Sequence, residues 1–514
     1  MLASLPLVAL AVMLAAPVTA APGDPDTMFH GDSKRLVDIG TNDIGNDVAI
    51  QPDGRVVTVG GHGSGTGFSV ARMLPNGALD TSFSGDGMRT FEDIGDPGFP
   101  VARAVHTLSN NRMLVAGQAY TSGFFAFGLI RVLPGGQQDM TFGTGGEALA
   151  ALGADGAWDV LVAPSGKIIV VGSGLGVGGD NDFALARFSA NGILDQTFGP
   201  EDNPGYAFAD FGNQESGRAG AIAPDGSIVV AGLASGSGGG NFGVARFTPG
   251  GEPDANFGTG GITTIDAPGD GTYDEATGVT VMPDGDIVVV GNTLTGAAAV
   301  VRLEPDGDPD PTFDDDGIVT FDPSSTATAM DVVRHHFGTI LVAGELNEPG
   351  PQRSGLVFRL EPDGDLDPTF GGGDGWTSMG YATRDDSLSS VAVDARSIMV
   401  AGTSAGEGDN DVFVARLRDR DRSTISVAFA RTPAKVRFTG RVTPNHSGQK
   451  VMVRFFRKQG GSFRLVGRKT PTLNASSSYS TSFARPTVAT CRVMVTYGGD
   501  LHHLPSNQTR TFGC

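Results

Sequence analysis

The sequence lacks the local signatures of several large enzyme classes. It contains no His-Glu-x-x-His zinc motif and no nucleophile elbow, in which a Gly-x-Ser-x-Gly turn joins a strand to a helix. Its Gly-rich stretches, 172–179 and 236–240, do not open a helix, so they do not fit a phosphate-binding loop. These absences argue against motif-based hydrolases, although a site assembled from loops of several repeats would leave no such signature.

Cysteine is scarce, with two copies, Cys491 and Cys514, among 514 residues. An even pair in an exported chain predicts one disulfide. After residue 20 there is no apolar run long enough to span a membrane, and no 3.6-residue periodicity of the kind that helical solenoids need. Instead, 78 Gly and 30 Pro separate short apolar runs, which is typical of a turn-rich all-β protein.

Residues 1–20 have the features of a signal peptide. Leu2–Val18 is largely apolar and uncharged, and Val18-Thr19-Ala20 fits the small-x-small pattern of a cleavage site. Pro6 and Pro17 interrupt the run, which argues against the alternative of a membrane anchor. The sequence therefore predicts a secreted or cell-surface protein, cleaved after Ala20, with no transmembrane segment left.

Acidic residues almost disappear from the last part of the chain. Residues 424–514 hold 14 Lys and Arg but a single acid, Asp500, so the net charge of −21 divides into +13 for this segment and −34 for the rest. Such a sign change marks a domain boundary and two different interaction surfaces. Residues 418–423, Arg-Asp-Arg-Asp-Arg-Ser, are expected to form a short charged linker between the two parts.

Two sequence markers each recur seven times before this boundary. The first is an arginine preceded by a small or apolar residue, repeated every 56 to 59 residues, at Arg72, Arg131, Arg187, Arg246, Arg302, Arg359 and Arg416. The second is Asp-x-x-Phe, which begins at Asp26, Asp80, Asp139, Asp195, Asp254, Asp310 and Asp367. Self-similarity at a fixed period is typical of repeat folds in which each unit packs on the next.

Each unit, taken to open at the aspartate and to close at the arginine, contains four short strands. In the fifth unit the strands are expected at 262–266, 277–282, 287–290 and 298–303. Pro283-Asp-Gly285 is expected to be a tight turn between two of them. Four strands in about 57 residues are typical of one propeller blade. The sequence therefore predicts an all-β fold with a seven-bladed β-propeller over residues 21–417.

The repeated pattern resembles the delta-60 repeat family of bacterial proteins. Asp-Pro-Thr-Phe stands at Asp310–Phe313, Pro-Asp-Gly-x-Ile-Val-Val-x-Gly at Pro283–Gly291, and the segment around the repeated arginine at Phe413–Leu417. The similarity covers about residues 24–417. It implies a propeller-like β-repeat of exported or surface-associated bacterial proteins, and it implies no catalytic residues.

Residues 424–514 are expected to form a small β-sandwich. Alternating apolar and polar residues predict strands at 435–438, 450–456, 479–483 and 492–497. The segments Gly440–Pro444, Gly448–Val451 and Tyr497–Asp500 resemble bacterial immunoglobulin-like domains of cell-surface proteins. A bond between the two cysteines would join a late strand to the chain end, unlike the central bridge of antibody domains.

The repeated arginines and aspartates are interpreted as framework. A marker that is present once in every unit specifies the unit, whereas a single ligand site would need only one or a few copies. We expect each arginine to bond an Asp-x-x-Phe carboxylate or a turn carbonyl, with the phenylalanine packed between blades.

Acidic turns are the candidates for a metal site. Calcium is often held by Asp and Asn at alternate positions beside Gly, and such residues occur at Asp314, Asp316, Asp180, Asp182, Asp409 and Asp411. None of these turns matches the full twelve-residue calcium loop, so solvated turns are the favoured interpretation. No cofactor is predicted.

The leading hypothesis is a monomeric, non-enzymatic extracellular protein whose propeller binds an unknown protein or polysaccharide. Residues 424–514 would attach to an anionic cell-surface polymer; docking on the acidic propeller or a merely solvated surface are the alternatives, and no nucleic-acid partner is expected.

The alternative function is a propeller hydrolase or lyase with its site in the central channel. An enzyme should gather residues with shifted pKa values at one mouth of the channel, and a scaffold should show a broad face of loops. Either site is expected where the units differ, such as the unusual turns at 334–338 and 394–396.

Overall fold

The computed structural model describes residues 21–514 apart from short stretches at 64–66, 154–155, 177, 237–238, 268–272, 324–325, 336–337, 348–351, 395–396, 407, 420, 423, 444–447, 460–461, 488–489, 499–502 and 505. The expected signal peptide, residues 1–20, lies outside the described residues. The described chain is built from strands, with one short 3-10 helix, η2 (Gly371–Gly373), and it confirms the all-β class. A helix long and apolar enough to cross a membrane is absent from the described part.

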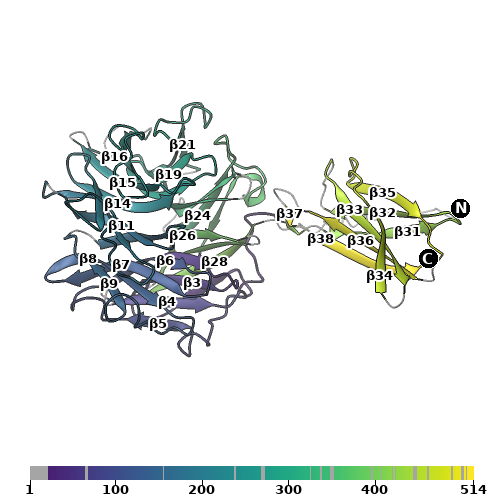
Figure 1. The fold of residues 1–514 in the computed structure, drawn as a ribbon, viewed down its shortest axis with the longest axis horizontal. Coiled ribbons are helices and arrows are strands. Elements are labelled where there is room, and N and C mark those ends of the chain that lie inside the picture. Colours follow the sequence, from purple (N-terminus) through teal and green to yellow (C-terminus); the bar gives the residue numbers. More distant parts are fainter. Residues whose placement is uncertain are drawn as a thin grey trace, which may run out of the picture.

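Described residues between 34 and 418 form seven four-stranded antiparallel sheets (Figure 1), which we number 1 to 7. Sheet 1 contains β2 (Ile44–Ile50), β3 (Val56–Gly61), β4 (Phe68–Met73) and β5 (Met88–Phe91). Sheet 2 contains β6 (Val101–Thr107), β7 (Met113–Thr121), β8 (Phe124–Val132) and β9 (Glu147–Ala150). Sheet 3 contains β10 (Gly156–Val162), β11 (Ile168–Leu175), β12 (Asn181–Phe188) and β13 (Tyr206–Ala209). Sheets 4 and 5 are β14 (Glu215–Ile222), β15 (Ile228–Gly236), β16 (Gly239–Phe247), β17 (Ile262–Ile265); and β18 (Glu275–Val281), β19 (Ile287–Asn292), β20 (Ala298–Leu303), β21 (Ile318–Phe321). Sheets 6 and 7 are β22 (Thr326–Arg334), β23 (Ile340–Asn347), β24 (Arg353–Leu360), β25 (Trp376–Met379); and β26 (Asp385–Val393), β27 (Ser397–Ala405), β28 (Asn410–Arg418), β1 (Lys34–Val37).

Apolar strands and glycine-ended turns explain why each unit folds in this way. Every residue of β3 and of β20 is buried, which is expected of strands covered on both faces. Gly54 and Gly285 end Pro-Asp-Gly turns with φ of 83° and 104°, a conformation that glycine adopts without strain.

The sequence unit and the sheet are offset by one strand, which corrects the expected strand order. β17, expected to be the first strand of the fifth unit, pairs with β16 and is the last strand of sheet 4. The chain reverses direction after the Asp-x-x-Phe turn, so the following strand completes the preceding sheet. Six of the aspartates therefore partner the arginine that precedes them along the chain, as Asp80 does with Arg72, whereas Asp26 partners Arg416 from the other end of the region.

The two ends of this region meet in sheet 7. β1 pairs with β28 as the last strand of that sheet, and β2 of sheet 1 packs on β26 and β27. The other first strands pack on the sheet before them in the same way, so the order of contacts closes on itself. At the closing junction one apolar cluster combines Phe29 and Val48 with Val412 and Val414. The apolar cores thus lie between adjacent sheets.

Residues 424–514 form two further four-stranded sheets, seen as the smaller body in Figure 1. One contains β30 (Thr424–Ile425), β31 (Ala428–Arg431), β32 (Lys435–Thr443) and β35 (Ser478–Ala484), and the other β33 (Val451–Gln459), β34 (Ser462–Lys469), β36 (Thr490–Tyr497) and β38 (Ser506–Gly513). A separate core, which includes Phe438 and Phe455, draws only on residues 425–514. β30, β31, β34 and β38 were not expected from the sequence; the alternation is weak in β34, where most side chains are exposed.

The predicted disulfide is confirmed. Cys491 in β36 and Cys514, which follows β38, are bonded, with 5.4 Å between their Cα atoms and a sequence separation of 23. The bond fastens the chain end to the strand beside it, because β36 pairs with β38.

Removing this bond should destabilise the C-terminal sheets selectively. For Cys491→Ser together with Cys514→Ser we expect a loss of about 2–4 kcal/mol in the free energy of unfolding of residues 424–514, because an open loop raises the entropy of the unfolded chain. Chemical denaturation of this fragment measures the loss. The wild-type fragment in reductant should match the variant, and an unchanged midpoint in both would contradict the expected role.

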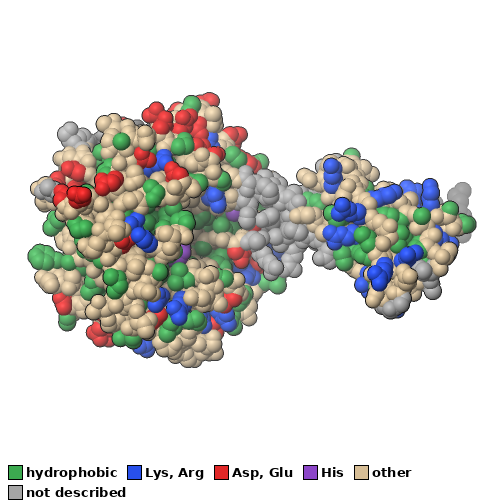
Figure 2. All heavy atoms as spheres, viewed as in Figure 1, with side chains coloured by type: hydrophobic (Ala, Val, Ile, Leu, Met, Phe, Trp, Pro, Cys, Tyr) green, Lys and Arg blue, Asp and Glu red, His purple; other side chains and the backbone are tan. Residues whose placement is uncertain are grey.

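The segment between the two parts is more than a charged linker. Arg418 ends β28, and β29 (Asp421–Arg422) pairs in parallel with β37 (His503–Leu504). Asp419 is fully buried, and its Oδ1 lies 2.6 Å from the Nε2 of buried His335 in the turn that follows β22. Figure 2 shows acidic and basic side chains together on the larger body, whereas the charged side chains visible on the smaller body are basic.

Candidate functional site

The repeated arginines lie on the third strand of each sheet and join adjacent sheets. In sheet 1, Arg72 Nε donates to Asp80 Oδ2 at 2.9 Å, and Nη1 donates to the Pro134 carbonyl of sheet 2 at 2.6 Å. The guanidinium also lies 4.7 Å from the centroid of the buried Phe83 ring. Each arginine had been expected to bond a carboxylate or a turn carbonyl, and Arg72 bonds both.

The same ion pair recurs in the other six sheets. It joins Arg131 to Asp139, Arg187 to Asp195, Arg246 to Asp254, Arg302 to Asp310, Arg359 to Asp367, and Arg416 to Asp26. The last pair, at 3.0 Å, links sheet 7 to the beginning of the chain, and Arg416 Nη1 also donates to the Pro75 carbonyl of sheet 1 at 2.5 Å. These residues join adjacent sheets, and none of them lines the cavities described below.

Several of these ion pairs also favour the ionised form of their aspartate. Burial would raise the pKa of Asp80, but hydrogen bonds from Ser82 and the charges of Arg72 and Arg55 lower it below the ordinary value. The pKa values of Asp310 and Asp367 are lowered in the same manner by a threonine and an arginine. Such carboxylates stabilise the fold above the ordinary aspartate pKa, and this contribution is lost as the pH falls below it.

A β-bulge in the first half or the middle of each first strand sends one side chain toward the centre. In sheet 1 the pairing of β2 with β3 shifts between Gly45 and Asp47, which leaves Asn46 as the bulged residue. A bulge adds a residue to one strand and re-aims its side chain. The other bulged residues are Arg103, Trp158, Arg218, Thr277, Met330 and Ser389.

All seven bulged residues, which we call the mouth ring, line one cavity of about 380 Å³. This volume is within the range of about 300–1,000 Å³ that is typical of small-molecule sites. A second cavity, of about 520 Å³, is lined by later residues of six of the seven first strands, which are mainly apolar, such as Val48, Val105 and Val391. The polar groups of the channel therefore gather at the end where the first strands begin.

Two arginines cover the tryptophan of the mouth ring. The guanidinium carbons of Arg103 and Arg218 lie 3.5 and 4.0 Å from the Trp158 ring centroid. Two groups this close would overlap on one face, so they cover opposite faces of the indole. Arg218 Nε also donates to Glu275 Oε1 at 2.7 Å. The indole is thus held in place and is not a free stacking platform, and its buried N–H has no acceptor among the described residues.

Three carboxylates follow bulged residues and converge on the same cavity. Asp47, Asp159 and Asp331 each accept the backbone N–H of their own next residue at 2.6–2.7 Å. The second oxygen of each accepts a backbone N–H from the next first strand, at 2.7 Å for Asp47, 2.9 Å for Asp159 and 2.8 Å for Asp331. They therefore fasten neighbouring sheets around the channel.

Burial raises the pKa of Asp159 and Asp331 to about 7, and the charge of Asp47 adds to the rise. Burial raises the pKa of Asp47 as well. Converging carboxyls with raised pKa values are the feature that sequence analysis expected of the enzyme alternative. Their backbone hydrogen bonds give them a structural role in addition.

These raised pKa values predict that stability falls as the pH rises from about 4, the ordinary aspartate pKa, to about 7. The folded protein holds protons on Asp159 and Asp331 that the unfolded chain, with ordinary aspartates, has released in this range. Denaturant unfolding at several pH values should show this fall in the free energy of unfolding. Asp159→Asn with Asp331→Asn should reduce the total fall by at least about 1.4 kcal/mol, which corresponds to one pKa unit. Asp314→Asn, at an exposed turn, should leave the fall unchanged. An equal fall in all three proteins would contradict the assignment.

The acidic turns chosen from the sequence have different surroundings. Asp314 and Asp316 lie in an exposed turn, where Asp316 Oδ1 accepts the Ile318 N–H at 3.0 Å. Asp409 Oδ1 accepts the Asn42 N–H at 2.6 Å.

Asp182 and Asp411, in contrast, are gathered with acidic residues of other segments. One group contains Asp182, Asp210 and Glu215, and the other contains Asp38, Asp43 and Asp411. Asp180 stays outside the first group, but its charge raises the pKa of Asp182.

Sequence reasoning missed the mouth ring and one motif-like segment. The letters Gly-x-Ser-x-Gly do occur, at Gly402–Gly406, but Ser404 is fully buried within β27 and its Oγ accepts a hydrogen bond from Arg384 Nε at 2.8 Å. A serine inside a strand lacks the geometry of a nucleophile elbow. The turns at 334–338 and 394–396 contain residues 336–337 and 395–396, which lie outside the described residues.

Sheets packed around a channel and clamped by a repeated ion pair define a β-propeller. Six segments match the family model described as "Domain of unknown function (DUF5122) beta-propeller", at residues 51–83, 108–142, 163–198, 223–257, 283–313 and 338–370. Each segment ends at the phenylalanine of an Asp-x-x-Phe marker. These matches support β-propeller repeats across residues 51–370.

Comparison with curated proteins finds no match. Among solved structures, the chain is similar to the crystal structure of S. cerevisiae core factor, with 9% identity and a TM-score of 0.34 over 74% of this chain and 57% of that chain. The chain thus spans little more than half the length of that protein, and the likeness carries no argument here.

Proposed function

We propose that the protein is a secreted or cell-surface binding scaffold of the delta-60 type, with a seven-bladed propeller and an immunoglobulin-like C-terminal domain. The seven sheets, the closing contacts of sheet 7 and the repeated arginine clamp support seven blades. Two facing sheets around a separate core support the second domain.

The observation that carries the binding proposal is the mouth ring. The inter-sheet clamp repeats the same arginine, aspartate and phenylalanine, whereas the seven bulged positions that line the cavity carry an amide, two guanidiniums, an indole, two hydroxyls and a thioether. The clamp positions are alike because each holds one sheet to the next. An asymmetric set of polar groups around one cavity supports a site for one polar ligand, such as the end of a polysaccharide.

A binding screen with the full chain tests this proposal. The probes are soluble peptidoglycan fragments, anionic wall polymers and neutral polysaccharides, and we expect at least one to bind. Arg218→Gln or Glu275→Gln should weaken that binding at least tenfold, because hydrogen bonds to charged groups contribute about 1.5–3 kcal/mol. Phe99→Ala, at a residue 60% exposed and outside the mouth ring, is the matched control. Binding that both mouth variants retain would contradict the site.

The basic C-terminal domain is proposed as the attachment module. Its net charge of +13 favours anionic wall polymers, and binding of this kind weakens with salt. Because its core draws only on its own residues, the fragment 424–514 can be tested alone. Salt-sensitive retention on an anionic wall polymer is the expected result, and no retention at low salt would contradict attachment.

A hydrolase or lyase acting in the channel is the second candidate. It is favoured by Asp47, Asp159 and Asp331, which converge with raised pKa values on the cavity. The same polymers, incubated with the protein and assayed for new reducing ends, separate the two functions. Turnover that Asp159→Asn abolishes would establish the enzyme, and binding without turnover would establish the scaffold.

A further inference from the structure

Three acidic side chains meet at the junction of sheets 3 and 4, away from the mouth ring. Asp182 lies near the start of β12, Asp210 follows β13 directly, and Glu215 is the first residue of β14. One carboxylate oxygen from each lies within 4.8 Å of the others. We propose that this group, which we call the acidic junction, binds a calcium ion.

The acidic junction contains buried oxygens without partners. Asp182 is 3% exposed and Glu215 is 2% exposed, yet Asp182 Oδ1 and Glu215 Oε2 accept no hydrogen bond from the described residues. Other oxygens are used, since Asp210 Oδ1 accepts the Gly212 N–H at 2.6 Å and Glu215 Oε1 accepts the Asn213 N–H at 2.9 Å. A buried carboxylate oxygen without a partner is costly, and a bound cation would offset that cost.

The charges around Asp182 are all of one sign. Asp210, Glu215 and Asp180 face it, and each of them adds to the rise in its pKa that burial begins. No cation of the protein is among the groups that shift it. A positive charge supplied from solution would therefore relieve the repulsion within the acidic junction.

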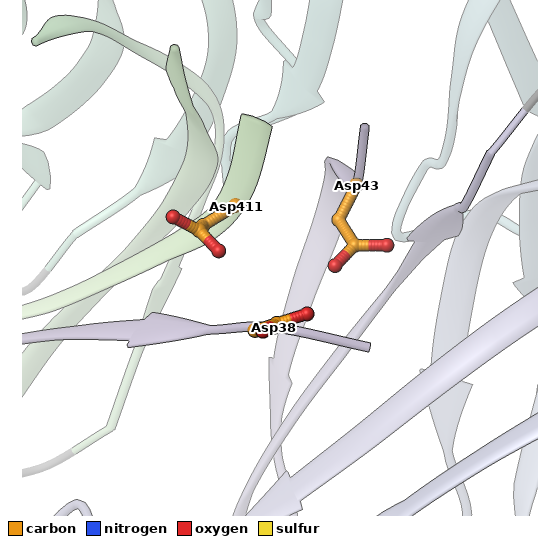
Figure 3. A group of neighbouring side chains, drawn as sticks. All are labelled: Asp38, Asp43 and Asp411. Atoms are coloured by element: carbon orange, nitrogen blue, oxygen red, sulfur yellow. The ribbon is translucent and has the colours of Figure 1, made fainter. Parts of the chain in front are cut away.

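The equivalent place between sheets 7 and 1 also contains a buried carboxylate oxygen without a partner, Asp43 Oδ1, but its balance of charge is different. Asp411 on β28, Asp38 after β1 and Asp43 before β2 lie around one space (Figure 3), and their oxygens are also within 4.8 Å of one another. There, however, Arg384 Nη2 donates to Asp411 Oδ2 at 2.5 Å. One junction thus has a guanidinium beside its carboxylates, and the acidic junction has none among the groups that act on Asp182.

The ligand chemistry favours calcium. All three side chains offer carboxylate oxygens, with no imidazole or thiolate in the group, and oxygen-only sites suit hard cations. Calcium tolerates irregular geometry and completes six to eight ligands with backbone carbonyls and water, whereas magnesium demands a near-ideal octahedron. Calcium sites of extracellular modules bind with Kd of about 10⁻⁴–10⁻³ M.

Calorimetric titration of the full, chelator-stripped chain with CaCl₂ tests the proposal. We expect saturable binding with Kd in the range of about 10⁻⁴–10⁻³ M, weakened at least tenfold by Asp182→Asn with Glu215→Gln. The control variant, Asp314→Asn with Asp316→Asn, removes two exposed acids and should bind as the wild type does. The experiment does not depend on the ligand site at the channel mouth.

The acidic-junction variant should fold, because without the ion its carboxylates repel each other. A melting temperature in chelator at or above that of the wild type checks this, and calcium should raise the melting temperature of the wild type but not of the variant. The proposal is overturned if calcium gives no binding heat, if the variant binds as the wild type does, or if magnesium binds with equal affinity.

Discussion

Arg359→Ala should lower the free energy of unfolding by about 3–5 kcal/mol, because it leaves a buried aspartate without its partner. Arg359 is 1% exposed and Asp367 is 0% exposed, and their side chains are joined at 2.7 Å. Arg359 Nη2 also donates to Thr369 Oγ1 at 3.1 Å, and the guanidinium lies 4.8 Å from the Phe370 ring centroid. Denaturant unfolding monitored by circular dichroism measures the loss.

Arg353→Ala is the matched control on the same strand. Its side chain is 49% exposed and pairs with Glu345 at 3.1 Å, and an exposed pair of this kind contributes at most about 1 kcal/mol. Equal losses of stability in the two variants would contradict the role of the repeated arginine in holding adjacent sheets together.

Phe29→Ala should lower the free energy of unfolding by about 3–5 kcal/mol, although Phe29 lies near the beginning of the described chain. Phe29 is fully buried in the cluster that joins sheet 1 to sheet 7, with Arg416 at 5.3 Å from its ring centroid. Thermal or denaturant unfolding of the full chain gives the loss, and Phe313→Ala, at the equivalent internal marker, should give a similar one.

Chain ends that are not tied down fray and tolerate substitution. If Phe29→Ala costs less than about 0.5 kcal/mol, as an exposed Phe99→Ala should, the first residues do not close the ring. The comparison thus separates a closed ring from an open row of sheets.

The contacts of the repeated arginine, aspartate and phenylalanine could be predicted from the sequence, because these residues recur in each unit. The eight-residue spacing of Arg302 and Asp310 occurs six times, and this pair is bonded in the structure at 2.6 Å. The repeats do not show where one sheet ends and the next begins, because the boundary of a repeated unit can be placed at any point of the repeat. Only the pairing of β17 with β16 decides to which sheet residues 262–265 belong.

The sites were harder to predict, because they depend on local geometry and on contacts between units. Trp158 and Arg218 reach the channel because each is the extra residue of a bulge, and strand alternation alone does not reveal a bulge. Asp182 was a candidate metal ligand from its own turn, but its neighbours Asp210 and Glu215 come from other strands. Their convergence follows from how sheet 3 meets sheet 4.

Tryptophan fluorescence gives the most direct test that the mouth ring binds a ligand. The chain has two tryptophans, so Trp376→Phe leaves Trp158, between Arg103 and Arg218, as the only one. The measurement is a titration of this variant with each polymer that the full chain retains in the binding screen. A saturable change in emission, with the affinity found in the screen, is the predicted result. Binding of every such polymer with no change in Trp158 emission would contradict the account.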